Sequence, residues 1–207
     1  MRTLVERSGE PRMGYRVAAV ISDQPMAAGL ATAAALGVPA RALPAPGRGA
    51  SAAARIAYDA ELAALIEQYS PSLIVLAGFM RILSPQFVAR FPGRVLNVHP
   101  SLLPKYPGLN THQRALDAHD AEHGATVHFV TAELDGGPPV IQGKLAVESG
   151  EDAQHLAARV HVLEHQIYPV AVRWFCDGRL RYAQGRAWLD GEVLSRPVLY
   201  DGIEDRR

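Results

Sequence analysis

The sequence predicts an α/β fold, with a mostly parallel central sheet flanked by helices and an antiparallel C-terminal part. In the first half, short apolar runs alternate with helical patterns, the order that gives parallel strands joined by right-handed crossovers. In the second half, two strand-like segments are separated only by a Gly-rich turn, which favours antiparallel pairing. We expect a single domain over residues 1–207, because this length is ordinary for one core.

The strands expected in the first half are apolar runs rich in β-branched residues and bounded by Gly, Pro or Ser. They cover residues 16–21, 73–77 and 95–98. The stretches between and after them carry helix signals, such as a stop at Gly37 and a cap at Ser84 followed by proline. These stretches predict helices over residues 26–36, 52–69 and 84–91.

The second half predicts one long helix among strands. An amphipathic stretch from residue 152 to about residue 175 ends before Gly178 and is typical of a surface helix. The Asp-Gly pair at 190–191 lies between apolar residues and predicts a terminal hairpin. The strands expected in this half are 124–131, 139–147, 180–182 and 187–193.

Composition limits the function. Hydrophobic residues make up 48% of the chain, and 21 basic residues balance 21 acidic ones, so nothing indicates a nucleic-acid or membrane-surface partner. The only cysteine, Cys176, excludes an intrachain disulfide and a cysteine-rich metal site, which fits a cytoplasmic protein. No apolar run reaches the roughly 18 residues of a membrane span, and the first residues are too charged for a signal peptide.

Asn97 and His99 are the most informative residues of the chain. They lie two apart where an expected strand ends before Pro100, so their side chains should face the same side. The segment 78–83 follows another expected strand, and ligands of open α/β sheets bind at the carboxyl ends of strands. We therefore expect both segments at one crevice.

Asp135 lies in a Gly-rich turn that could bring its carboxylate toward this edge. An amide, an imidazole and a carboxylate suit acyl transfer, as an oxyanion donor, a proton shuttle and a group that orients the shuttle. Taken alone, His99 is equally well a buried core histidine, and Asp135 is more simply a turn residue.

The pattern His161-x-x-Glu164-His165 matches an inverted zinc-peptidase motif, since residues i and i+4 of a helix share a face. Little chain follows it to supply a third ligand, so an ordinary helix with solvated histidines is the simpler interpretation. His128 lies on an expected strand beside the proposed site, and both core packing and a supporting role stay open for it. We expect surface positions for His112, His119, His123 and His155.

Four longer segments are distinctive: Asn97-Val-His-Pro-Ser-Leu-Leu-Pro-Lys-Tyr-Pro-Gly108, Ala77-Gly-Phe-Met-Arg-Ile-Leu-Ser-Pro85, Glu122-His-Gly-Ala-Thr-Val-His-Phe-Val130 and Glu133-Leu-Asp-Gly-Gly-Pro138. Together they resemble the folate-dependent glycinamide ribonucleotide formyltransferases of purine synthesis. The resemblance runs from about residue 16 to the C-terminus. Formyltransferases that act on methionyl-tRNA and formyl-folate hydrolases share the Asn-x-His and Asp-Gly patterns but differ after Leu-Leu-Pro.

The resemblance implies a Rossmann-like formyltransferase fold and transfer of a formyl group from 10-formyltetrahydrofolate to the amine of phosphoribosylglycinamide, without a metal. It implies that Asn97 holds the formyl oxygen, that His99 is the acid/base or a cationic stabiliser, and that Asp135 orients His99. Partners would be small molecules only, and the protein a monomer or homodimer. The other residues to which the resemblance assigns contacts are Arg55 for the folate tail, Met80, Arg81, Ile82 and Leu83 for the pterin, and Glu164 for the glycinamide substrate.

The chain departs from the family at its start. Family members open with a strand and a Gly-rich loop whose N–H groups hold the substrate phosphate, whereas Met1-Arg-Thr-Leu-Val-Glu-Arg7 resembles the helix after that loop. We therefore expect the first strand and the phosphate loop to be missing, through a truncated reading or in a real shortened form. The alternative functions are a folate-binding remnant with impaired catalysis and a zinc peptidase using His161 and His165.

Overall fold

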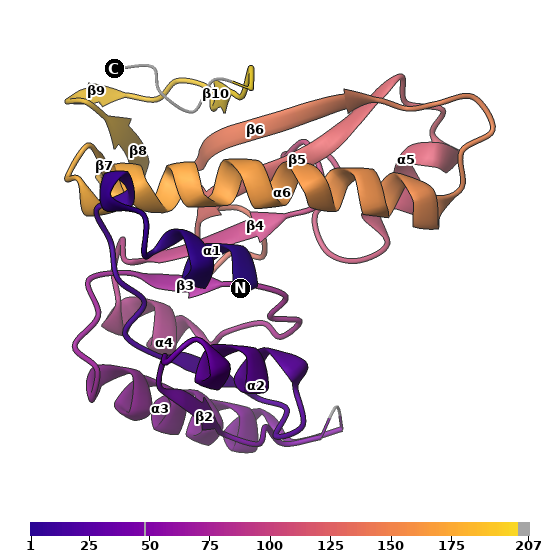
Figure 1. Ribbon diagram of the computed structural model, residues 1–207. Coiled ribbons are helices and arrows are strands. Elements are labelled where there is room, and N and C mark those ends of the chain that lie inside the picture. Colours follow the sequence, from indigo (N-terminus) through magenta and orange to yellow (C-terminus); the bar gives the residue numbers. More distant parts are fainter. Residues whose placement is uncertain (48, 203–207) are drawn as a thin grey trace.

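A computed structural model describes residues 1–47 and 49–202 (Figure 1). The helices are α1 (Arg2–Arg7), α2 (Ala28–Ala35), α3 (Ala52–Glu67), α4 (Pro85–Arg90), α5 (Thr111–Asp117) and α6 (Ala153–Cys176), with a 3-10 turn at Pro11–Met13. The strands are β1 (Val20–Ser22), β2 (Ala40–Ala42), β3 (Ile74–Leu76), β4 (Val95–His99), β5 (Glu122–Phe129), β6 (Pro139–Ala146), β7 (Leu180–Ala183), β8 (Arg186–Leu189), β9 (Glu192–Val193) and β10 (Val198–Leu199).

A five-stranded sheet forms the centre, in the order β10-β6-β5-β4-β3. Strands β3 and β4 run parallel, whereas β5 is antiparallel to both of its neighbours, β4 and β6. Helix α6 runs along the sheet and contacts β5 and β6 (Figure 1). The predicted α/β class and the antiparallel pairing in the second half are therefore confirmed.

Strands β1 and β2 form a separate parallel pair, in which Val20 lies opposite Ala40 and Ser22 opposite Ala42. Helix α2 packs on both of them. Within the described residues, no hydrogen-bonded ladder joins this pair to β3. The parallel strands of the described chain thus lie in two separate sheets.

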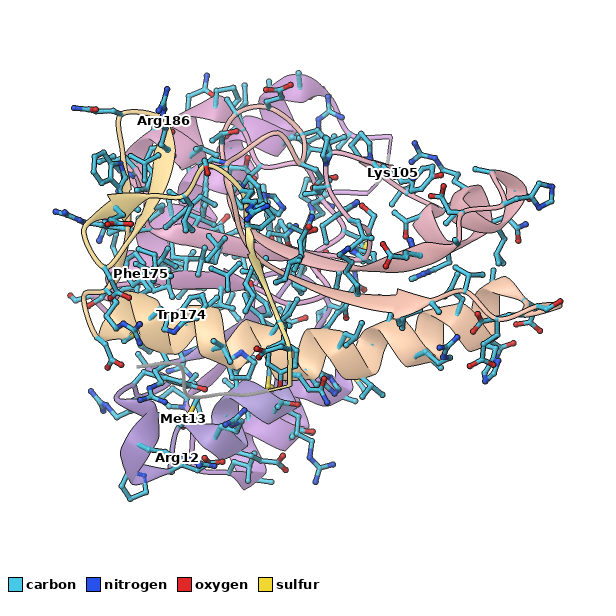
Figure 2. All side chains as sticks on the ribbon, turned by 90° about the horizontal axis from the view of Figure 1, so that it is seen from above. Arg12, Met13, Lys105, Trp174, Phe175 and Arg186 are labelled. Atoms are coloured by element: carbon cyan, nitrogen blue, oxygen red, sulfur yellow. The ribbon has the colours of Figure 1, made fainter. Side chains whose placement is uncertain are left out.

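Helix α6 covers the sheet with a continuous apolar face. The helix begins where the Asp152 carboxylate accepts the backbone N–H of His155 at 2.8 Å. Val160 and Ile167 are fully buried against the sheet, and burying such a side chain contributes about 1.5–3 kcal/mol. Near the other end, the ring of Phe175 (labelled in Figure 2) lies among the core side chains that pack on the sheet.

Tyr168 ties α6 to the strands that carry the site. The side chain is 4% exposed, and its hydroxyl lies 2.8 Å from the carbonyl oxygens of both Leu76 and Leu96. Burial raises the pKa of Tyr168 well above its usual value, so the hydroxyl stays neutral and donates. One hydroxyl thereby links the helix to both β3 and β4.

The loop between β3 and α4 is held from α3. Asp59, which is 6% exposed, accepts the backbone N–H of Ser84 at 2.6 Å. Ser84 then accepts the N–H of Phe87 at 3.3 Å and so begins α4. Because Phe87 and Leu83 are buried beside α3, the end of this loop is fixed.

The structure differs from the predicted elements in several places. The strand expected over residues 16–21 is β1, which covers only Val20–Ser22. The 3-10 turn, β2, α5 and β10 were not predicted, and the expected terminal hairpin is a three-stranded meander, β7-β8-β9. β2 is Ala-Arg-Ala without a β-branched residue, and α5 follows Asn110, whose φ of 58° is left-handed and whose side chain makes no cap. The sequence signals that usually predict a strand or a helix are therefore missing from β2 and α5. No described helix is long and apolar enough to cross a membrane.

Candidate active site

Strand β4 ends with the two residues that the sequence singles out. Asn97 lies between Leu76 of β3 and His128 of β5, and His99 lies opposite Thr126 of β5. Asn97 and His99 share one face of the sheet, as their spacing predicts. His99 is 5% exposed, so interactions of its ring are only weakly screened by water.

Each ring nitrogen of His99 faces an oxygen atom. Nε2 lies 2.8 Å from the backbone carbonyl oxygen of Tyr106, which can only accept, so Nε2 carries a hydrogen. Nδ1 lies 3.4 Å from Oδ2 of Asp135. The imidazolium is the form that can donate on both sides, so this arrangement suits a positive charge on the ring.

Asp135 reaches β4 from the turn between β5 and β6. Its φ of 50° lies in the left-handed region, which Asp adopts more readily than most residues. Close by, a side chain on Gly137 would collide with the carbonyl oxygen of Phe129, so the turn requires glycine there. Oδ2 of Asp135 also accepts the N–H of Gly108 at 2.8 Å. The Gly-rich turn therefore brings the carboxylate to the imidazole and holds it there.

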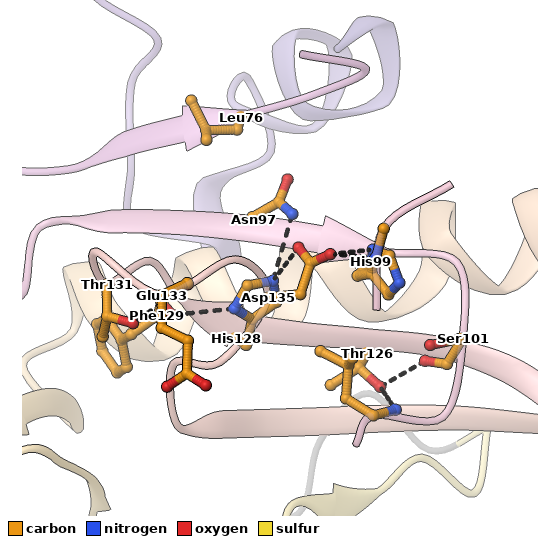
Figure 3. Close-up of polar contacts among 12 residues, drawn as sticks. Leu76, Asn97, His99, Ser101, Thr126, His128, Phe129, Thr131, Glu133 and Asp135 are labelled. Atoms are coloured by element: carbon orange, nitrogen blue, oxygen red, sulfur yellow. Dashed lines mark hydrogen bonds and ion pairs between the residues drawn. The ribbon is translucent and has the colours of Figure 1, made fainter. Parts of the chain in front are cut away.

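His128 joins Asn97 to Asp135 (Figure 3). Its Nε2 lies 3.2 Å from Nδ2 of Asn97 and 3.8 Å from Oδ1 of Asp135. Its Nδ1 lies 2.9 Å from the carbonyl oxygen of Phe129. The ring is 2% exposed, and this burial lowers the pKa of His128. Sequence reasoning left its role open; the structure gives it polar contacts to two of the three site residues.

The segment after β3 presents apolar side chains. Met80 is 75% exposed and Ile82 is 70% exposed, whereas Leu83 is buried. The guanidinium of Arg81 lies over the ring of Tyr58, 5.2 Å from its centre. Met80 and Ile82 thus form an exposed apolar surface, while Arg81 and Leu83 are held by the protein itself.

Arg55 and Glu164 lie elsewhere on the chain, and none of the described contacts joins them to His99. Arg55 is exposed on α3. Glu164 lies on α6 and its carboxylate accepts a hydrogen bond from Nδ1 of His161 at 2.8 Å; the ring of His165 lies beside that of His161, tilted by 58°. Over residues 1–47 and 49–202, no group of three His, Cys, Asp or Glu side chains could hold a metal ion, so the geometry gives the zinc alternative no support.

Two histidines expected at the surface lie inside. His123 is 1% exposed and His112 is half-buried, with Nδ1 of His112 3.1 Å from Nε2 of His123. Burial lowers the pKa of both rings, to about 4 for His123. The prediction was wrong because each ring supplies the other's polar partner, which the sequence does not reveal. His119 and His155 are exposed as expected.

Fold and site together define a class: α/β proteins that gather an amide, an imidazole and a carboxylate at the carboxyl end of a sheet strand. The model of the formyl transferase family matches residues 1–172. The chain is 57% identical to phosphoribosylglycinamide formyltransferase of Escherichia coli (strain K12) over 140 residues, which cover 68% of this chain and 66% of that protein. The enzyme of the same name from Haemophilus influenzae is 50% identical over 131 residues, 63% of this chain and 62% of that protein.

A solved phosphoribosylglycinamide formyltransferase from Coxiella burnetii has the same fold. It superposes with a TM-score of 0.88 at 40% identity, over 96% of this chain and 92% of that chain. The chain belongs to the formyl transferase family. It spans 66% and 62% of the lengths of the two curated bacterial relatives.

Proposed function

We propose that the chain transfers a formyl group from 10-formyltetrahydrofolate to the amine of 5-phosphoribosylglycinamide, a step of de novo purine synthesis. Its two bacterial relatives are named as formyltransferases of phosphoribosylglycinamide. The observation that carries the proposal is the 3.4 Å approach of Asp135 to His99, beside Asn97 on the same strand. We also propose that residues 1–207 act as one formyltransferase domain in the cytoplasm, as a monomer or homodimer that binds small molecules only.

The reaction moves one acyl group and one proton between two nitrogens. The substrate amine attacks the formyl carbon, and the formyl oxygen gains negative charge. The attacking nitrogen then loses a proton, and the folate nitrogen gains one as it leaves. Proximity of the two substrates and a donor for the oxyanion are the main requirements.

Asn97 is the proposed donor to the oxyanion. Its amide nitrogen has two hydrogens, of which one is directed to Nε2 of His128 at 3.2 Å. The other is left for the formyl oxygen. Loss of such a donor raises the barrier by about 3 kcal/mol in other acyl-transfer enzymes.

His99 is the proposed cationic stabiliser of the same intermediate. Both of its ring nitrogens are already occupied, by the carbonyl oxygen of Tyr106 and the carboxylate of Asp135. To exchange a proton with the substrate directly, the ring would first have to leave one of these partners. A positive charge on the ring needs no such step and stabilises the developing negative charge.

The folate is proposed to lie against the exposed apolar residues at the sheet edge. Met80, Ile82 and Leu134 are each at least half exposed, an unusual position for large apolar side chains that suits a flat pterin ring. The backbone from Met80 to Leu83 is proposed to bind the polar edge of the pterin. Arg55 is proposed to pair with the folate tail. The carboxylate of Glu164 is proposed to bind the glycinamide substrate in place of its present partner, His161.

The test is to assay turnover and folate binding separately on the purified chain. We expect formylation of phosphoribosylglycinamide that depends on both substrates. Folate binding without turnover at saturating substrate would instead support a catalytically impaired remnant. Stoichiometric zinc with peptidase activity that a chelator removes would support the alternative built on His161 and His165.

A further inference from the structure

His128 occupies a special place beside the proposed oxyanion donor. In the antiparallel ladder of β4 and β5 it is the direct partner of Asn97, where the two side chains are neighbours on one face. The register of β5 against β6 shifts between Val127 and His128, so the ring lies at a local irregularity of the strand. Such irregularities re-aim side chains, and here the affected side chain is an almost fully buried histidine.

The contacts of the ring define which nitrogen carries its hydrogen. The carbonyl oxygen of Phe129 lies 2.9 Å from Nδ1 of His128 and can only accept, so Nδ1 is the donor. Burial lowers the pKa of His128, which keeps the ring neutral near neutral pH. A neutral imidazole carries one hydrogen, so Nε2 presents a lone pair.

This lone pair selects the orientation of the Asn97 amide. The two ends of an amide are nearly equal in size but opposite in hydrogen bonding, so packing alone does not distinguish them. A lone pair on Nε2 attracts Nδ2 of Asn97, 3.2 Å away, and would repel Oδ1. The amide therefore keeps its nitrogen on the side shared with Asp135 and keeps one N–H for a further acceptor.

We propose that His128 is a positioning residue for formyl transfer, which holds the amide of Asn97 with its nitrogen as the donor to the formyl oxygen. This inference rests on the proposed function of the chain. Two charged groups face the ring and act in opposite directions. The carboxylate of Asp135, whose Oδ1 lies 3.8 Å from Nε2, raises the pKa of His128, whereas His99 lowers it as burial does, and burial is the largest effect.

Two substitutions separate positioning from mere packing. In His128→Gln, the side-chain oxygen can take the place of Nε2 and accept from Asn97, whereas His128→Phe fills the ring volume and accepts nothing. We expect His128→Phe to lower kcat roughly 10- to 100-fold with KM for both substrates within about threefold, and His128→Gln to recover most of the loss. A His128→Phe variant with the kcat of the wild type would overturn the proposal. A kcat that falls in both variants in proportion to their loss of folding stability would also overturn it.

A spectroscopic measurement tests the same inference without turnover. Nitrogen-15 NMR of the wild-type chain should show Nδ1 of His128 protonated and Nε2 bare between about pH 6 and pH 8. The side-chain amide resonances of Asn97 should shift in His128→Phe and stay close to wild type in His128→Gln. A ring protonated on Nε2 would refute the positioning role even if the chain is active. An inactive wild type with the expected ring state would refute the proposed function instead.

Discussion

Replacing Asp135 by asparagine tests the electrostatic part of the site most selectively. The change keeps the size of the side chain, and Asn tolerates the left-handed φ of 50° as well as Asp does. The side-chain oxygen of asparagine can still accept the N–H of Gly108, which now lies 2.8 Å from the carboxylate. What is lost is the negative charge beside His99.

The size of the effect follows from the geometry. A carboxylate 3.4 Å from an imidazolium interacts by about 5 kcal/mol at an effective dielectric constant of about 20. Part of this interaction energy already stabilises the ground state, so its loss does not raise the barrier. The amide dipole of the variant replaces another part. We expect a barrier higher by about 3 kcal/mol, or a kcat roughly 100-fold lower, with folate affinity within about threefold of wild type.

The assay is steady-state formyl transfer together with a direct binding measurement for the folate. Asp117→Asn is the matched control, because the carboxylate of Asp117 also accepts an amide hydrogen bond, from Nε2 of Gln113 at 2.7 Å, but lies on the exposed surface of α5. The control should keep wild-type kcat. An Asp135→Asn variant that retains more than half of the wild-type kcat would refute the role given to the carboxylate.

Three further predictions concern the oxyanion donor, the core and acid stability. Asn97→Ala should lower kcat by roughly 100-fold or more while folate binding stays nearly unchanged, and an equal loss in both would contradict an oxyanion role. Tyr168→Phe should reduce the free energy of unfolding by about 0.5–1.5 kcal/mol in urea titrations, since it removes the hydroxyl that hydrogen-bonds to the carbonyl oxygens of Leu76 and Leu96; no change would show that the hydroxyl is dispensable. Burial lowers the pKa of His123 from 6.5 to about 4, so the folded chain takes up this proton less readily than the unfolded chain. Stability should therefore be full above about pH 6.5 and decline as the pH falls toward 4, and a flat profile in urea titrations at successive pH values would contradict this reading.

Local sequence signals predicted most of the elements that carry the site. The apolar run at β4 and the cap at Ser84 lie where the sequence places them, and the Asn-x-His spacing puts Asn97 and His99 on one face. These features depend on neighbours in the chain, so a single sequence reveals them. The turn of Asp135 was also visible, but its direction toward β4 was an inference from chemistry and family resemblance.

Features that depend on strand register could not be predicted in the same way. His128 lies opposite Asn97 only because β5 runs antiparallel to β4 in one particular register. His123 is buried because His112, on another element, accompanies it. Neither pairing leaves a local signal, so sequence reasoning kept one role open and placed the other residue wrongly at the surface.

The most direct measurement follows a labelled formyl group through the reaction. With 10-formyltetrahydrofolate carrying carbon-13 in its formyl group, NMR should show the label moving onto the amine of phosphoribosylglycinamide in the presence of the wild-type chain. The transfer should be strongly slowed in Asp135→Asn. Label that stays on the folate, or that is released as formate with no formylated product, would contradict the claim that Asn97, His99 and Asp135 together transfer a formyl group.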